Sequence, residues 1–539
     1  MRRTEVLEKL HDKLGLRTNP VIFFVSAGLT ALFVAVTIAF TAPVDQFFGT
    51  LSSWILEKLG WFYILGVTTF LIFLIWIALS RYGNVRLGGQ HERPEFSNAV
   101  WFAMLFAAGI GTILMFWGVA EPISHYAEPP QQNVAPQSVP AAKEAMNFTL
   151  YHFGLHTWTI FCLPALAFAY FIYKRKLPAR VSSIFQPLLG DRIYGPIGKV
   201  IDITAVIGTI FGVGVSIGLG TLQITSGLSR LFGVSEGKIT QILVIAVVTV
   251  IALISVALGL TKGIKRLSNI NILMAVGLLV FVLATGSTLY LTRGIIETTG
   301  NYLSSLVPLS FWNDTFGNTG WQGSWTVFYW AWTITWSPFV GIFIARISRG
   351  RTIRDFVRGV LLLPTAFSVV WFSVFGMAAF EIERDGSGGL VDAVVGDGDI
   401  PGALFTFLEN FPLATGISAI SVLIVVIFFT TSMDSAALVV DMLCTGESEP
   451  GPTRQRVFWG ITVGVVAGTL LAATGKGGLE ALQEVITVVG LPFFIIAFLM
   501  MYNLVRALRS DVGNFLPPGS ARARRASTSE QEEGVVARD

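Results

Sequence analysis

The chain has 539 residues, of which 53% are hydrophobic and 13% are charged, and its formal net charge is +3. Soluble domains carry about 25% charged residues, so this composition excludes an ordinary soluble protein. Apolar segments of about 20 residues recur from end to end, which is the length that spans a bilayer as an α-helix. β-barrels show shorter, alternating segments. We therefore predict an all-α polytopic membrane protein.

Twelve spans follow one another along the chain. They lie near residues 20–42, 60–80, 98–118, 147–173, 201–229, 239–260, 268–292, 322–346, 357–380, 413–442, 457–475 and 483–506. We divide the chain into a cytoplasmic N-terminal segment (1–19), two accessory helices (20–97), a first repeat (98–300), a second repeat (301–506) and a disordered cytoplasmic tail (507–539). Segment 293–306 is too polar to span and is expected along the outer surface.

Lysine and arginine set the orientation, because cytoplasmic loops carry an excess of both. With residue 1 inside and twelve spans, all but seven of the 37 basic residues fall on the cytoplasmic side. The seven outside are Lys58, Lys143, Arg230, Lys238, Arg293, Arg384 and Lys476. Both termini are therefore expected in the cytoplasm, in a multi-pass protein of the plasma membrane.

Two spans contain residues that weaken a helix in its middle. The third reads MLFAAGIGTILMFWG, with Gly109 and Gly111 beside Ala107 and Ala108, and the eighth carries Pro338. Glycine and proline both favour local breaks. The two spans lie five apart, so they begin two successive five-helix units, which insert upside down relative to each other because five is odd. Interrupted helices at matching positions of inverted repeats point to a transporter's binding site.

The eighth span, WTVFYWAWTITWSPF, is crowded with aromatic residues. Phe328, Trp332 and Trp336 follow at four-residue steps and share one helix face. The fourth span offers a second set within one broad arc, namely Phe153, Trp158 and Phe161. Packed together, these faces would form an aromatic box that binds a quaternary ammonium through the ring quadrupoles. Ordinary aromatic core packing is the alternative explanation.

The blocks at 104–122, 262–272, 325–356 and 428–443 resemble those of the betaine/choline/carnitine transporter family. The resemblance implies twelve helices, with spans 3–12 as two inverted five-helix repeats of the amino-acid/sodium symporter type. It also implies uptake of trimethylammonium compatible solutes, often by a homotrimer. Carried over by position, Trp332, Trp336 and Phe328 form the substrate cage with Trp158. Phe153 and Phe161 stand where the family usually has Trp and Tyr, and Thr333 replaces a second tryptophan.

The glycine-rich break in span three bears on the other end of the solute. Backbone N–H groups at Ala108, Gly109 and Gly111 would attract a carboxylate. Choline-selective family members tend to carry an acidic residue where this chain has Ile113. A zwitterion such as glycine betaine is therefore favoured. Choline, ectoine, proline and dimethylsulfoniopropionate are the alternatives.

A sodium site is implied on span ten. Thr431 and Ser432 offer hydroxyls beside Phe428, and the backbone carbonyls of Ala107 and Ile110 would complete the shell. Back-bonding of the hydroxyls within the helix is the simpler explanation. The family's second sodium site uses span five, where Val213 stands in place of the expected threonine. We expect no other cofactor, and sodium symport ahead of proton coupling.

Two further groups of residues have more than one interpretation. His152 and His156 lie one turn apart, but we find no third metal ligand beside them and interpret them as hydrogen-bonded core residues. The cluster Arg346, Arg349, Arg351 and Arg354 either clamps a cytoplasmic gate through acidic or backbone partners or only sets the topology.

Other classes of protein fit less well. An enzyme would need a nucleophile with its base or a metal set, and neither HExxH nor Gly-x-Ser-x-Gly occurs. A channel would need a lined pore, whereas paired broken helices at an aromatic box indicate occlusion. An osmosensing role could accompany transport. The expected partners are the lipid bilayer and the solute, and nucleic acid is not one of them.

Overall fold

The computed structural model describes residues 7–8, 11–109, 111–131, 133–258, 261–447, 451–472 and 478–511; the side chains of residues 106–112, 261–266 and 478 are outside this description. Within these residues the regular elements are helices, and the one extended pairing is an isolated bridge between Arg86 and Thr352. The predicted tail from residue 512 onward lies outside the described residues.

The long helices run in the following order. They are α2 (Pro20–Ala39), α3 (Thr41–Leu79), α4 (Asn98–Gly109), α5 (Gly111–Ala127), α6 (Val139–Phe153), α7 (Leu155–Phe168), α9 (Pro196–Phe232), α10 (Lys238–Leu258), α11 (Thr261–Thr285), α12 (Thr288–Phe311), α13 (Phe328–Ile347), α14 (Ile353–Asp385), α16 (Ala414–Thr445), α17 (Thr453–Ala472) and α18 (Gly478–Ser510). Shorter pieces include α8 (Gln186–Leu189), α15 (Ala403–Leu408) and the π-helical turns η2 (Ala169–Lys174), η5 (Gly323–Val327) and η6 (Asp392–Gly396).

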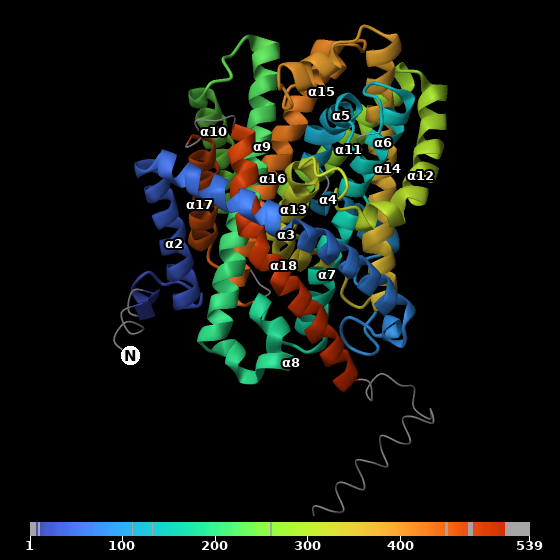
Figure 1. Ribbon diagram of the computed structural model, residues 1–539. Coiled ribbons are helices and arrows are strands. Elements are labelled where there is room, and N and C mark those ends of the chain that lie inside the picture. Colours follow the sequence, from blue (N-terminus) through green and yellow to red (C-terminus); the bar gives the residue numbers. More distant parts are fainter. Residues whose placement is uncertain are drawn as a thin grey trace, which may run out of the picture.

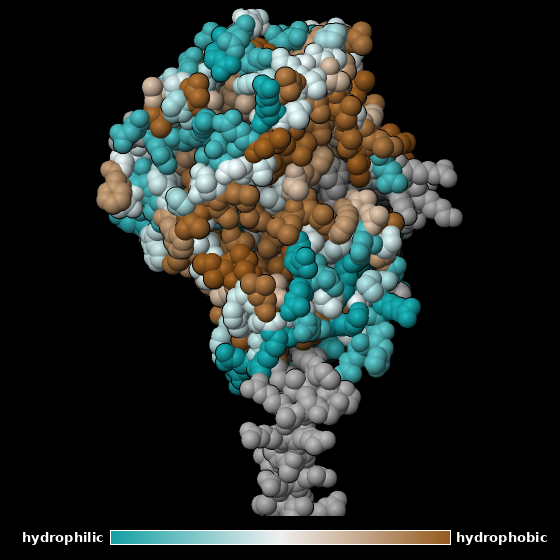
Figure 2. Space-filling view, turned by 90° about the vertical axis from the view of Figure 1, so that its right-hand side faces the viewer, coloured by the Kyte–Doolittle hydropathy of each residue, from teal (hydrophilic) through white to brown (hydrophobic). Residues whose placement is uncertain are grey.

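Eleven helical segments among the described residues are long and apolar enough to cross a membrane. They match eleven of the predicted spans, and α4 and α5 cover the remaining one at 98–118. Figure 2 shows apolar residues gathered across the middle of one face, with hydrophilic residues concentrated above and below. The prediction of an all-α polytopic membrane protein is confirmed.

The helices differ sharply in how deeply they lie in the bundle. In the most apolar windows of the segments 139–174 and 323–347, 94% of residues are buried, against 28% in α2, α10 and the segment 267–285. Spans four and eight therefore lie at the centre of the molecule, largely enclosed by the other helices. α3 crosses the front of the bundle obliquely in Figure 1.

The packing repeats after a shift of five spans, as two related repeats require. α7 packs against α13, and its counterpart α14 packs against α5. α10 contacts α16, and its counterpart α17 contacts α9; α11 contacts α16, and its counterpart α18 contacts α9. The start of α2 and the end of α18 lie at the same end of the bundle (Figure 1).

The second span is longer than expected, and segment 293–306 forms part of a separate helix. The second span was expected to start near residue 60, but α3 already begins at Thr41. Pro43 falls in its first turn, where backbone N–H groups have no helical partner and proline is tolerated. Segment 293–306, expected not to span, lies within α12, which is not among the candidate spans of the described residues.

The predicted break of the eighth span at Pro338 is wrong, because α13 continues through this proline. Pro338 cannot donate to the carbonyl of Ile334 four residues earlier. The hydroxyl of Ser337 donates to that carbonyl instead, at 2.8 Å. The neighbouring serine thus satisfies the carbonyl that the proline leaves without a donor. The helix continues, so residues before and after Pro338 lie on the same face of α13.

The fourth span is interrupted at Gly154, which the sequence analysis did not predict. α6 ends before this glycine and α7 starts after it. The backbone N–H of Leu155 donates to the hydroxyl of Tyr302 on α12 at 3.0 Å. A Cβ atom at Gly154 would lie 2.5 Å from the carbonyl oxygen of Leu150 and 2.6 Å from the Tyr302 hydroxyl, so only glycine fits.

We therefore expect Gly154→Ala to destabilise the protein by about 1–3 kcal/mol, the range for inserting a methyl group into a packed site. The measurement is the midpoint of thermal unfolding in detergent. Gly300→Ala on the neighbouring helix α12 is the matched control, because a Cβ atom there meets nothing within 4 Å. Equal midpoints for the two variants would show that the close approach at Gly154 is relaxed in solution.

Candidate substrate and ion sites

A ladder of stacked rings runs along one face of α13. The ring centroids of Phe328 and Trp332 lie 5.8 Å apart at an interplanar angle of 9°, and those of Trp332 and Trp336 lie 6.4 Å apart at 26°. Phe339, the residue after Pro338, continues the ladder from Trp336 with centroids 6.2 Å apart at an angle of 19°. All four side chains are buried. The four-residue spacing read from the sequence therefore produces one continuous aromatic face.

Helix α7 supplies the second wall at the Trp336 end of the ladder. The ring of Phe161 meets Trp336 edge to face, with centroids 5.2 Å apart, and Trp158 lies 5.6 Å from Phe161. Five predicted cage residues thus form one unbroken chain of ring contacts. The sixth, Phe153, instead stacks on Phe372 of α14 at 4.7 Å and contacts Tyr329 at 5.0 Å.

Helix α9 holds the central indole in place. Trp332 Nε1 donates to Ser216 Oγ at 3.1 Å, and that hydroxyl donates to the carbonyl of Gly212 at 3.0 Å. At Gly212, a Cβ atom would lie 2.6 Å from Thr335 Oγ1, so the glycine lets α9 approach α13 closely. Ser216 lies in span five, which was considered only as a source of hydroxyls that bind sodium, and its contact with Trp332 was not predicted.

The predicted carboxylate end of the site lies partly outside the described residues. Ile110 and the side chain of Ala108 are outside them, so binding of a carboxylate by the backbone N–H groups of Ala108, Gly109 and Gly111 stays a prediction. α4 ends at Gly109 and α5 begins at Gly111, on either side of this position. Ile113, the first described side chain of α5, is buried.

The predicted sodium ligands on α16 lie close together. The hydroxyl of Thr431 is 3.0 Å from the carbonyl oxygens of both Ile427 and Phe428, so its proton is used within the helix, as the simpler explanation expected. The lone pairs of its oxygen stay available to accept a hydrogen bond or to bind a cation. Ser432 follows directly, half-buried. Ile110 and the side chain of Ala107 lie outside the described residues, and the complete site stays a prediction.

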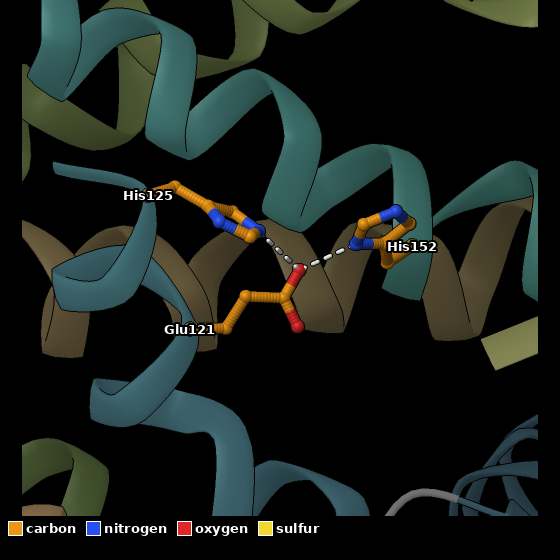
Figure 3. A group of neighbouring side chains, drawn as sticks. All are labelled: Glu121, His125 and His152. Atoms are coloured by element: carbon orange, nitrogen blue, oxygen red, sulfur yellow. Dashed lines mark hydrogen bonds and ion pairs between the residues drawn. The ribbon is translucent and has the colours of Figure 1, made fainter. Parts of the chain in front are cut away.

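A second polar cluster lies beside the ladder and contains residues that the sequence analysis missed. Glu121 Oε1 lies 2.6 Å from Nδ1 of His152 and 3.3 Å from Nε2 of His125 (Figure 3). Tyr329 donates to Glu121 Oε2 at 2.5 Å. His156 bonds separately to Ser310 at 2.9 Å. Both predicted histidines are buried and hydrogen-bonded as expected, but they do not share a site: His152 lies with Glu121 and His125, a grouping that was not predicted.

The predicted arginine cluster finds acidic and backbone partners at the loop between α13 and α14. Arg349 pairs with Glu92, whose pKa is lowered by the backbone N–H of Gly89 and by this arginine. Arg351 donates to Asn98 at 2.8 Å and to the Phe96 carbonyl at 2.9 Å. These contacts join segment 85–98 to the start of the second repeat. A gating role for the cluster stays a prediction.

The sequence matches the model of one protein family, described as "BCCT, betaine/carnitine/choline family transporter", over residues 21–513. The chain is 51% identical to the ectoine/glycine betaine/proline transporter EctP of Corynebacterium glutamicum, over 93% of this chain and 82% of that one. It is 45% identical to a glycine betaine transporter of Acinetobacter baylyi, over 92% of this chain and 74% of that one. It is 39% identical to a high-affinity choline transport protein of Escherichia coli, over 93% of this chain and 74% of that one.

We expect Ser216→Ala to lower the stability of the protein by about 1–3 kcal/mol, because the buried indole N–H of Trp332 would lose its acceptor. Thermal unfolding in detergent measures this change. Ser226→Ala is the matched control on the same helix, since the Ser226 hydroxyl is buried without a partner among the described residues. If both variants unfold at the same temperature, the bond to Trp332 contributes nothing to stability.

Proposed function

Because the chain belongs to the betaine/carnitine/choline transporter family, whose members are transporters and not enzymes, we propose that it imports glycine betaine by sodium symport. The observation that carries the choice of solute class is the buried ladder of Phe328, Trp332 and Trp336 with Phe161 at one end. A trimethylammonium group offers no N–H donor, so it is recognised best by aromatic faces away from water.

A zwitterion is favoured over choline as the solute. The buried position after the glycine-rich turn, where choline-selective relatives tend to carry an acid, holds Ile113. Without a fixed anion, the carboxylate of the solute itself balances its ammonium. The name of the 51% identical relative includes ectoine, glycine betaine and proline, which favours a zwitterion-selective site. Choline is the alternative, given the 39% identical choline transport protein.

Alternating access in the plasma membrane completes the proposal. The start of α2 and the end of α18 share one end of the bundle, and the excess of lysine and arginine assigns that end to the cytoplasm. The backbone and side-chain oxygens near Thr431 and Ser432 provide the hard oxygen ligands that a sodium ion needs. Family membership favours a homotrimer, and solute accumulation of this kind serves osmoregulation.

Uptake by proteoliposomes containing the purified chain is the direct test. We expect labelled glycine betaine to accumulate under an inward sodium gradient, with unlabelled ectoine and proline competing more strongly than choline. A proton gradient alone should drive little uptake. Accumulation of choline in preference to glycine betaine would overturn the assignment of the solute.

Trp332→Leu and Trp336→Leu should each weaken glycine betaine binding by roughly 30-fold, because a desolvated cation–π contact contributes about 2 kcal/mol. Trp332→Phe should retain part of the affinity, since it keeps a π-face. Trp330→Leu is the control, because this indole lies against Tyr151 and His156. Binding measured by isothermal titration that stays unchanged in both ladder variants would refute the cage.

The double variant Thr431→Ala, Ser432→Ala should raise the sodium concentration for half-maximal uptake by at least about tenfold, as expected when oxygens around a metal ion are lost. Thr430→Ala on the same helix is the matched control, since its hydroxyl bonds to the Val426 carbonyl at 2.9 Å. A sodium requirement that is equal in all three proteins would place the coupling ion elsewhere.

A further inference from the structure

Glu121, His125 and His152 form a buried three-residue cluster where α5 meets α6 (Figure 3). Each of the three residues has a relative exposure of 0%. Each offers one atom that can bind a metal, and the three atoms lie within 4.8 Å of one another. None of them belongs to the predicted solute or sodium sites.

The donor set suits one class of ion. Two neutral imidazoles and one carboxylate are a common zinc ligand set, with the fourth position of the tetrahedron left open. At zinc–ligand distances of about 2.0–2.2 Å, tetrahedral geometry separates ligand atoms by roughly 3.3–3.5 Å. The observed distances of 2.6 and 3.3 Å from Glu121 Oε1 to the two histidine nitrogens are within about 1 Å of that arrangement.

Outer contacts orient two of the three ligands, His152 and Glu121, whereas Nδ1 of His125 has no hydrogen-bond partner among the described residues. His152 turns Nδ1 toward Glu121 while its Nε2 is bonded to Thr326 Oγ1 at 2.8 Å. Tyr329 holds the other carboxylate oxygen, Oε2, at 2.5 Å. Metal-binding histidines and carboxylates usually have such partners, which fix the tautomer and the ring orientation.

The cluster also lacks a permanent positive charge. Among the described residues, the ion-pair partners of Glu121 are His125 and His152, with no lysine or arginine. A buried carboxyl group either takes up a proton or, if it stays ionised, needs a cation nearby. A shared proton would satisfy the short contact to His152, but the 3.3 Å contact to His125 exceeds the usual hydrogen-bond range and equals the spacing of two ligands around one metal ion.

We propose that Glu121, His125 and His152 bind one divalent transition-metal ion of the zinc class and that this ion clamps α5 to α6. The proposal goes beyond solute transport. Metal binding is measured on the purified chain without any uptake, so either proposal can fail without the other.

The test uses the full chain, purified in detergent and stripped with a chelator. After equilibrium dialysis against Zn²⁺, mass spectrometry should find one equivalent of zinc per chain. Glu121→Gln and His152→Gln should weaken binding by more than the roughly 10–100-fold that loss of an outer partner costs, and Thr326→Val should fall within that range. His156→Gln is the matched control, because His156 is equally buried on the next turn and bonds to Ser310.

Two further measurements guard against misfolded variants and adventitious ions. His125→Gln removes the ligand with the longest contact and should still elute as a folded protein, yet Zn²⁺ should raise the unfolding temperature of the wild type only. Co²⁺ should give intense tetrahedral absorption bands in the wild type and not in His125→Gln. Equal zinc binding by Glu121→Gln and His156→Gln would overturn the proposal. Absence of zinc from the folded wild type would also overturn it, and would mean that a shared proton, not a metal ion, neutralises Glu121.

Discussion

The rest of the structure depends on one constraint: backbone polar groups at the centre of the bundle must find partners inside the protein. Nearly all residues of α7 and α13 are buried inside the protein. At Pro338 the hydroxyl of Ser337 satisfies the Ile334 carbonyl, and at Gly154 the hydroxyl of Tyr302 satisfies the Leu155 N–H. The first contact keeps α13 straight enough for Trp336 and Phe339 to stack across the proline, while the second lets span four change direction.

Close approach of the helices follows from small residues at their crossings. Gly212 brings α9 against α13, and Gly220 makes room for the ring of Phe429 on α16, 1.5 Å from where a Cβ atom would be. α9 is therefore packed between the helix that carries the ladder and the helix that carries the predicted sodium ligands. Ser216 on α9 fixes Trp332, so a movement of α9 relative to α16 changes the position of an indole in the ladder. This is a physical route by which an ion site could affect a solute site.

Sequence reasoning recovered what depends on periodicity and composition. The spans follow from apolar length, and the shared face of Phe328, Trp332 and Trp336 follows from the 100° turn per residue. It failed where the outcome depends on a partner from a distant segment. Pro338 predicts a break unless the hydroxyl of Ser337 is known to bond to the Ile334 carbonyl. Gly154 gives no signal of an interruption in the sequence, because the interruption depends on Tyr302 from α12. Phe153 fits the arc of Trp158 and Phe161 only if span four is one straight helix, and the interruption at Gly154 moves it to Phe372 instead.

The Glu121 cluster was missed for the same reason, because His152 is 31 residues from Glu121 in sequence and meets the Glu121–His125 pair only when α5 packs against α6. Its position shows how closely the polar and aromatic parts of the core are connected. Tyr329 bonds to Glu121 and its ring lies 6.5 Å from that of Trp332, so one residue of α13 touches both the cluster and the ladder. A cation held by Glu121 would repel a quaternary ammonium at the ladder, and neutralising the carboxylate would remove an attraction. If the cluster holds an ion as proposed, occupancy of the two sites would be coupled through electrostatics even without a movement of the helices.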